Sequence, residues 1–284
     1  MSTRAAVLIL EHQNPRRLAV LARSLRHADI DLYIHIDARV SLDPFVRELP
    51  ADHQIFYVTD RVPVHWGGLS VVRACHASLG QAMDSDHDYG RYAFLSGADM
   101  RIAPLEEIVQ AWGTAVEFLG VERLLTPPGA RADWRVARRH FLDAPGFIAR
   151  HVSGRFPRPV DTTVALHHGS AWWALTAGAA RYVRDFIEQH PEWMRFHRHT
   201  FASDEIIVPS IIASSPFAAQ LVSEDARTVH GMHYIDWPGA TSTHPRVLGI
   251  EDIEALRSSS ALFARKVGEH FEELTTALQT DTHR

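Results

Sequence analysis

The strongest constraint on the fold is a series of short apolar segments that alternate with segments of helical periodicity. The first segment, residues 5–10, is apolar throughout, as in a strand that is buried on both faces of a sheet. Asn14 and Pro15 follow and supply an N-cap and a first-turn proline for a helix. Further strands are expected at 31–37, 54–60 and 91–99, and further helices at 69–83 and 104–113. This alternation predicts an α/β fold with a mainly parallel sheet.

The second half of the chain resumes a regular order. One helix is expected over 204–215, where Pro209 either kinks or divides it. The other elements expected are a strand at 169–176, a helix at 179–190, a turn-rich stretch at 234–246 and a last helix at 250–278 that breaks at its three serines.

Residues 126–168 interrupt this pattern with many prolines and weak periodicity. Seven arginines (131, 135, 138, 139, 150, 155 and 158) stand there against three aspartates. We interpret the stretch as an excursion from the sheet, with two short helices and loops. Long irregular segments are often binding loops or lids. The alternative is a solvated basic face without a ligand.

Composition excludes several classes of protein. The chain has 284 residues, of which 29 are Lys or Arg and 34 Asp or Glu, so its net charge of −5 argues against a nucleic-acid binder. The single cysteine, Cys75, excludes an internal disulfide and multi-cysteine metal sites and favours a reducing compartment. No apolar run is long enough to span a membrane. We therefore expect a cytoplasmic protein, with peripheral membrane contact left open.

Several nucleotide and hydrolase motifs are absent. The chain contains no P-loop, no GxGxxG fingerprint and no GxSxG elbow. It also lacks a DxD pair after the strand at 91–99, where Asp99 has no acidic partner two residues away. The usual P-loop hydrolases, many dinucleotide enzymes and the α/β-hydrolases are therefore excluded, and a divalent ion held by DxD is not expected.

Histidines raise the alternative of a metal-dependent hydrolase. Nineteen are present, and three clusters are candidate ligand sets: His167 with His168, His197 with His199, and His230 with His233. None has the HExxH spacing of a zinc protease, and adjacent residues on a strand point to opposite faces. Such a hydrolase would lose activity to a chelator.

Two charged pairs are candidates for chemistry, each with a structural alternative. Asp204 and Glu205 could provide a general base, or could simply favour the N-terminus of the following helix. Arg265 and Lys266 could bind an anion, or could lie exposed on an amphipathic helix. Composition and spacing do not decide between these readings.

A set of spaced motifs resembles a known family. In the first half these are LILEHQNP, YIHIDAR, VPVHWGGLSVVRA and FLSGADMRI; in the second half they are GSAWWALT, HTFASDE, YIDWPG, HPRVL and LFARK. In this order they resemble the core-2/I-branching N-acetylglucosaminyltransferases and the related protein xylosyltransferases, over about residues 5–270. With one cysteine and no expected membrane anchor, the chain is most similar to the compact bacterial branch.

The resemblance implies a GT-A-type glycosyltransferase fold, a mostly parallel Rossmann-like sheet flanked by helices in a single domain over 1–284. Residues 1–125 would be the nucleotide-binding half, 126–168 a variable acceptor-side excursion, and 169–278 the half that carries the catalytic base and the diphosphate site. The implied partners are a UDP-sugar donor and a glycan, lipid-linked, peptide or small-molecule acceptor. No cofactor and no divalent metal are implied.

The resemblance also assigns residues to the donor site. Trp172 matches a donor-sugar contact, while Ala171 stands where xylosyltransferases often have Asp, a departure that leaves the donor sugar open. Asp99 is expected near the sugar or acceptor, and either Thr241 or Ser242 at the diphosphate. The nucleotide would be bound by Glu11, His12, Asp37, Val64, His65 and Trp66.

The implied reaction inverts the anomeric centre and uses no metal. Glu205 matches the catalytic base, and Arg265 with Lys266 matches the pair that neutralises the leaving diphosphate. We therefore predict transfer of GlcNAc or xylose from a UDP-sugar to an acceptor hydroxyl, giving a β-linkage. Besides the hydrolase, the alternative is a sugar-nucleotide- or carbohydrate-binding protein without turnover.

Overall fold

The computed structural model describes residues 4–144, 146, 151–162, 164–221, 231–239 and 244–279. Its centre is a six-stranded sheet in the order β3-β2-β1-β4-β9-β6. The four strands from β3 to β4 are parallel, β9 is antiparallel to both of its neighbours, and β6 therefore runs with the majority. The strands are β1 Ala5–Glu11, β2 Ile30–Ile36, β3 Ile55–Tyr57, β4 Arg91–Ser96, β6 Phe118–Leu124 and β9 His167–Thr176. The predicted α/β fold with a mostly parallel sheet is confirmed.

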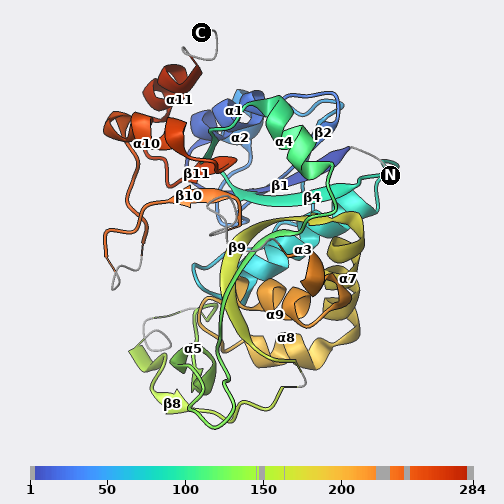
Figure 1. Ribbon diagram of the computed structural model, residues 1–284, viewed down its shortest axis with the longest axis vertical. Coiled ribbons are helices and arrows are strands. Elements are labelled where there is room, and N and C mark those ends of the chain that lie inside the picture. The colour runs from blue at the N-terminus through green and yellow to red at the C-terminus, as the bar shows by residue number, and fades with distance from the viewer. Residues whose placement is uncertain are drawn as a thin grey trace.

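Helices cover both faces of this sheet and create two cores. Along β1, Val7 and Ile9 face one core, while Ala6 and Leu8 face the other. Helices α1 Pro15–Ser24, α2 Asp43–Glu48 and α4 Leu105–Trp112 pack on the first face, and α3 Leu69–Met83, α7 Ala177–Gln189, α8 Pro191–His197 and α9 Ile207–Ala213 on the second (Figure 1). The strand is buried on both sides, which explains its uninterrupted apolar sequence.

A second, three-stranded sheet brings the C-terminal part of the chain to the middle of the molecule. Its order is β10-β11-β5, from His233–Ile235, Phe263–Arg265 and Asp99–Arg101. The predicted break of the 250–278 helix at its three serines is confirmed, since the helical part ends at Ser258, but the continuation as a helix directly after them was wrong. The segment contains η3 Ile250–Asp252, α10 Ile253–Ser258, the strand β11 and α11 Phe271–Gln279. Pairing with β5 and β10 overrides the helical periodicity around the three serines.

Three further expectations need correction. The break in 204–215 falls at Ile206, because Pro209 lies in the first turn of α9, where its missing N–H costs no helical bond. The strand β6 was not predicted at all. In the excursion 126–168, where two short helices and loops are expected, the described residues include the helix α5 Trp134–Ala137 and helical residues at 151–152, but also an unexpected two-stranded ribbon, β7 Arg138–Arg139 with β8 Phe156–Pro157, at one end of the molecule (Figure 1).

Among the described residues, none of the helices is both long enough and apolar enough to span a membrane. The division of the chain at 125 and 168 stays a prediction.

Candidate active site

The carboxyl ends of β1, β2 and β4 meet at one edge of the sheet, where ligands bind in open α/β folds. Main-chain hydrogen bonds join these ends, because the N–H groups of Asp37 and Gly97 donate to the carbonyls of Glu11 and Leu10. The carboxylate of Glu11 is buried and accepts bonds from the N–H groups of His12 and Gln13, both at 2.7 Å. Its side chain therefore shapes the turn after β1, while His12 stands exposed.

Asp37 lies next to Glu11 at this edge, and its carboxylate is also buried. Burial would raise the pKa of Asp37, but hydrogen bonds from Arg39 and from the main chain at Arg39 and Val64 outweigh it and lower the pKa. The closest of these contacts joins Arg39 to Asp37 Oδ2 at 2.6 Å. Asp37 is thus an ionised carboxylate that connects β2 with the loop beginning at Val64.

The loop from Val64 to Gly68 also contacts the segment before Glu205. The N–H of Ala202 donates to the carbonyl of Gly67 at 2.8 Å. Trp66 is 58% exposed, and its ring lies edge-on to that of Phe201 with the centroids 5.6 Å apart. The ring of Trp134 in α5 is tilted against that of Phe201, with the centroids 4.9 Å apart. Aromatic side chains from three segments therefore form one partly exposed wall beside the turn at Ala202.

Arg265 occupies a cation site built by β11, β5 and β9. It is the register partner of Asp99 in the second sheet, and its NH1 lies 3.3 Å from Asp99 Oδ1. Its guanidinium stacks on Trp172 at 4.3 Å from the ring centroid. Asp99 is held in turn by His233 Nε2 at 3.1 Å and by the N–H of Ser96 at 2.8 Å. A buried carboxylate thus fixes an arginine against an aromatic ring.

Asp204 and Glu205 lie in the short helix η1 Ser203–Glu205, close to Arg265. Burial lowers the pKa of Arg265, whereas the charges of Asp99, Asp204 and Glu205 act in the opposite direction. Oδ1 of Asp204 is buried and has no hydrogen-bond partner among the described residues. Burial and the neighbouring charge of Glu205 raise the pKa of Asp204 to about 7. Two adjacent carboxylates therefore differ, since only Glu205 is well exposed.

A histidine contacts the exposed carboxylate. His168 Nε2 lies 3.1 Å from Glu205 Oε2, and its Nδ1 lies 2.8 Å from Glu122 Oε2 on β6. Burial would lower the pKa of His168, but the hydrogen bonds to Glu122 and Glu205 outweigh it and raise the pKa to about 9. The side chain is therefore an imidazolium at neutral pH.

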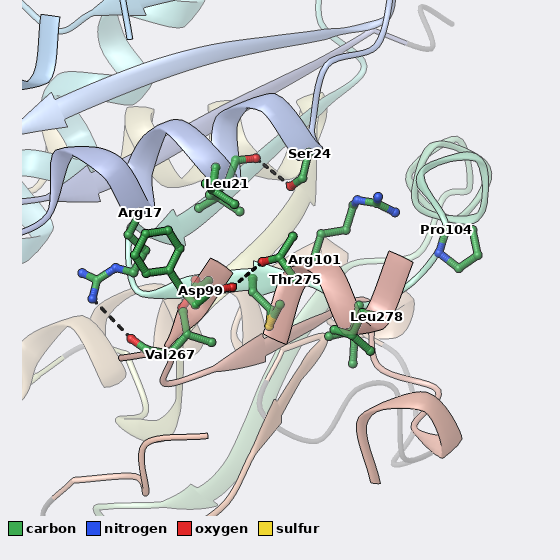
Figure 2. A pocket seen from close by; sticks show the side chains of 13 residues that line it. Arg17, Leu21, Ser24, Asp99, Arg101, Pro104, Val267, Thr275 and Leu278 are labelled. Carbon is green, nitrogen blue, oxygen red and sulfur yellow. Dashed lines mark hydrogen bonds between the residues drawn. The ribbon is translucent and has the colours of Figure 1, made fainter. Parts of the chain in front are cut away.

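One cavity near this region is lined by Asp99 but not by Glu205. It measures about 70 Å³ and is lined chiefly by α1, β5 and α11 (Figure 2). Arg17 closes one side, donating to the carbonyls of Gly97 at 2.7 Å and Val267 at 3.3 Å. Asp99 therefore lines this cavity, whereas Arg265 and Glu205 do not.

Comparison with known proteins assigns the chain to a family. The sequence profile of the core-2/I-branching enzymes matches residues 6–257. The chain belongs to the core-2/I-branching enzyme family. Since this is a family of glycosyltransferases, the predicted family and enzyme class are both confirmed.

Curated relatives of this family member include two mammalian enzymes. Mouse xylosyltransferase 2 is 24% identical over 92% of this chain and 31% of its own length. Human xylosyltransferase 1 is 23% identical over 92% of this chain and 28% of its own length. The chain thus spans about a third of the length of the curated relatives that it matches.

Solved structures with a similar fold are more distant in sequence. The galactosyltransferase LgtC, in complex with donor and acceptor sugar analogues, aligns with a TM-score of 0.48 at 11% identity, covering 96% of this chain and 95% of LgtC. Mouse xyloside xylosyltransferase 1 aligns with a TM-score of 0.40 at 14% identity, covering 92% and 96% of the two chains.

The structure brings part of the predicted donor site together. Trp172, Arg265 and Asp99 are in contact, with Glu205 nearby. Asp99 is expected near the sugar or acceptor, which stays a prediction, and its fully buried side chain contacts Arg265 and His233. Arg265 is not on an exposed helix, and Lys266 follows it, partly exposed, at the end of β11. Thr241 and Ser242 lie outside the described residues.

The sequence analysis did not name Glu122, and it gave other roles to Asp204 and His168. Asp204 was grouped with Glu205 although their surroundings differ, and nothing in the sequence signals the burial of one and the exposure of the other. Glu122 and His168 meet where the pairing of β6 with β9 is irregular, because Val121 pairs with Gly169 and Arg123 with His168, so that Glu122 lies at a register shift. The only available signal was the HH pair at 167–168, which was considered as a metal-ligand pair.

The histidine clusters are dispersed among different environments. His197 is buried between Trp193 and Phe196, and His233 faces Asp99. His199 Nδ1 contacts the carbonyl of His140, and His230 lies outside the described residues. Within the described ranges, no group of three or more His, Cys, Asp or Glu side chains is arranged to hold a metal ion.

Proposed function

We propose that this chain transfers a sugar from a UDP-sugar to an acceptor hydroxyl, with inversion at the anomeric carbon and without a divalent metal. The observation that carries the proposal is the approach of an exposed carboxylate, Glu205, to a fixed cation, Arg265, which stacks on Trp172. Such a transfer needs a base at one end of the reacting sugar and an anion-binding cation at the other, and here the cation lies beside an aromatic ring.

The nucleotide would bind at the carboxyl ends of β1 and β2. Asp37 presents an ionised carboxylate there, and the loop 64–66 lies against it through the main chain of Val64. Trp66 offers an exposed indole for stacking. His12 and His65 would complete the surroundings of the uridine, with the buried Glu11 acting through the main chain of its turn.

In the proposed reaction, the acceptor oxygen attacks C1 of the sugar from the face opposite the diphosphate. The bond from that oxygen to C1 forms while the bond from C1 to the diphosphate oxygen breaks, and the hydroxyl proton passes to Glu205. The leaving diphosphate gains negative charge, which Arg265 and Lys266 would balance. A guanidinium can donate to two phosphate oxygens at once, while the lysine supplies a compact charge.

Metal independence is proposed from the chemistry of Asp99. In a DxD site the acidic residues carry a divalent ion that neutralises the diphosphate. Here Asp99 has no acidic partner two residues away, and its carboxylate contacts Arg265 and His233. Because Arg265 already contacts this carboxylate, a divalent ion would have to compete with it for Asp99, and the positive charge at the diphosphate would come from Arg265 together with Lys266.

The donor is proposed to be UDP-GlcNAc or UDP-xylose, and the acceptor an anionic molecule. Four arginines of the excursion stand exposed near α5, at positions 131, 138, 139 and 155. They would attract a phosphorylated carrier or an acidic glycan. We further propose a cytoplasmic location, since the one cysteine is buried and unpaired, as a reducing compartment permits.

Thermal-shift measurements with UDP and four UDP-sugars (GlcNAc, xylose, glucose and galactose), each with EDTA or with manganese, test this proposal. A ligand that binds only the folded state raises the Tm. We expect UDP and one UDP-sugar to raise it equally with EDTA and with manganese. No shift with any uridine nucleotide would contradict the donor assignment, and a shift that needs manganese would contradict metal independence.

Two other functions predict different results. A metal-dependent hydrolase would release product in a reaction that EDTA stops. A binding protein without turnover would be stabilised by a UDP-sugar and would transfer it to no acceptor.

A further inference from the structure

His168 lies between two carboxylates that come from two other elements. It belongs to β9, while Glu122 belongs to β6 and Glu205 to η1. The distances are 2.8 Å from Nδ1 to Glu122 Oε2 and 3.1 Å from Nε2 to Glu205 Oε2. The imidazole side chain is 15% exposed, whereas the side chains of Glu122 and Glu205 are 41% and 37% exposed. The three side chains make a continuous hydrogen-bonded row that ends at Glu205.

The charge state of this row follows from its donors and acceptors. An ionised carboxylate can only accept hydrogen bonds, and a neutral imidazole has a single N–H. Contact with both carboxylates is therefore satisfied by the imidazolium, which donates from both nitrogens. Arg123, opposite His168 on β6, contacts Asp133 at 2.8 Å, and Asp204 and Arg265 approach this row from the side of Glu205.

We propose that His168, oriented by Glu122, is a positioning residue that holds the carboxylate of Glu205 in place for its reaction with the acceptor hydroxyl. This inference rests on the proposed function. The bond from His168 occupies Oε2 of Glu205 and leaves Oε1 for the acceptor. During the reaction the hydroxyl proton moves to Glu205, and His168 keeps both of its own protons. The sequence provides no such device next to Asp204.

Glu122 orients the imidazole of His168. Its bond to Nδ1 fixes the plane of the imidazole, in the same way as a carboxylate orients the histidine of a hydrolytic triad. Without Glu122 the imidazole would retain one carboxylate and a broader range of orientations. Glu122→Gln is therefore expected to weaken the hold on Glu205 without touching any group that contacts substrate.

A first experiment needs no substrate. The imidazole of His168 is titrated by NMR in the wild type, with His168→Gln identifying its signals. We expect a midpoint near pH 9, as the raised pKa requires, and a clear downward shift in Glu122→Gln and in Glu205→Gln. A wild-type midpoint at or below about 6.5, the ordinary value for histidine, would overturn the inference.

The second experiment compares kinetics of His168→Gln with those of His167→Gln, its neighbour on β9. His167 Nδ1 contacts the carbonyl of Ala165 in its own segment, so this variant controls for a substitution in the strand. We expect His168→Gln to lower kcat roughly tenfold with KM for the donor unchanged. The wild-type rate should fall above about pH 9, and this fall should be absent from the variant.

Different results would contradict the positioning role of His168 and the proposed function. Wild-type kcat and an unchanged pH profile in His168→Gln, together with inactive Glu205→Gln, would overturn the positioning role alone. Wild-type turnover in Glu205→Gln would overturn the proposed function on which it rests.

Discussion

Asp204 and Glu205 are neighbours in the sequence, but their surroundings give the two carboxylates different properties. Glu205 is exposed enough to meet an acceptor and is held by His168. Burial and the neighbouring charge of Glu205 raise the pKa of Asp204, whose buried Oδ1 has no hydrogen-bond partner among the described residues. For an acid this means that the folded state binds the proton more tightly than the unfolded state, so stability falls as the pH rises from about 4 to about 7.

Replacement of Asp204 tests this account. Asn resembles the protonated acid, so Asp204→Asn should stabilise the protein above about pH 7 by roughly 1–3 kcal/mol. The difference from the wild type should disappear near pH 4, where both side chains are neutral. Urea unfolding at both pH values measures it. A stability difference that is independent of pH would contradict the raised pKa of Asp204.

Arg265 is the residue on which the leaving-group chemistry depends. Arg265→Lys keeps a positive charge beside Asp99 but loses the planar fork and the stacking on Trp172. We expect kcat to fall and UDP to bind more weakly. Arg265→Ala should reduce kcat by about 10²–10³. Because this variant leaves the buried carboxylate of Asp99 without its arginine, circular dichroism should confirm that the variant is folded. Wild-type kcat and UDP affinity in Arg265→Lys and Arg265→Ala would contradict the assignment.

At the scale of elements, the site depends on turns that hold strained main-chain conformations. Ala202, just before η1, has φ 50° and ψ 56°, and Gly67, whose carbonyl it contacts, has φ 71°. The left-handed region costs a residue with a side chain about 1–2 kcal/mol. The loop 64–68 and the turn that carries Glu205 are therefore joined at a point where the main chain has little conformational freedom.

Gly67→Ala should disturb this junction. An added Cβ would lie 3.2 Å from Leu142 Cδ1 in a left-handed conformation, and we expect a loss of stability of about 1–2 kcal/mol with reduced transfer. Gly80 within α3 is the matched control, because its Cβ would meet nothing within 4 Å. Gly80→Ala should instead stabilise the protein by up to about 1 kcal/mol. Equal effects in thermal unfolding would contradict the argument.

Most elements of the first half, though not α2 or β6, could be predicted because their own residues specify them. The strand from Ala5 is apolar along its buried length, and Asn14 caps the next helix by accepting from the N–H of Arg17. The strand at 263–265 could not be predicted, since pairing with Asp99–Arg101 determines it. Similarly, family resemblance proposed Glu205 and Arg265, whereas the contact between His168 and Glu122 arises only from the register of β6 and β9.

At the scale of the whole molecule, charge is unevenly distributed. The chain has a net charge of −5, yet exposed arginines gather around α5 and the ribbon of β7 and β8. This region lies at one end of the molecule, away from α10 and α11 (Figure 1). Such an excess of positive charge is expected to attract an anionic acceptor without affecting the donor.

Salt should therefore weaken acceptor binding. Raising the ionic strength from low values to about 0.15 M should increase KM for an anionic acceptor several-fold and leave KM for the donor nearly unchanged. The double variant Arg138→Ala with Arg139→Ala should show a similar increase at low salt. Arg181→Ala on α7 is the control, since Arg181 is exposed elsewhere. A KM for the acceptor that does not respond to salt would contradict an anionic acceptor.

The central claim is that Glu205 removes the proton from the acceptor, and Glu205→Gln tests it most directly. Gln has the same shape but cannot accept the proton. In one preparation, transfer of the sugar and binding of UDP are measured for the wild type and the variant. We predict that transfer falls by about 10²–10⁴ while UDP affinity stays within about twofold. Transfer at the wild-type rate by a folded variant that binds UDP would contradict the account.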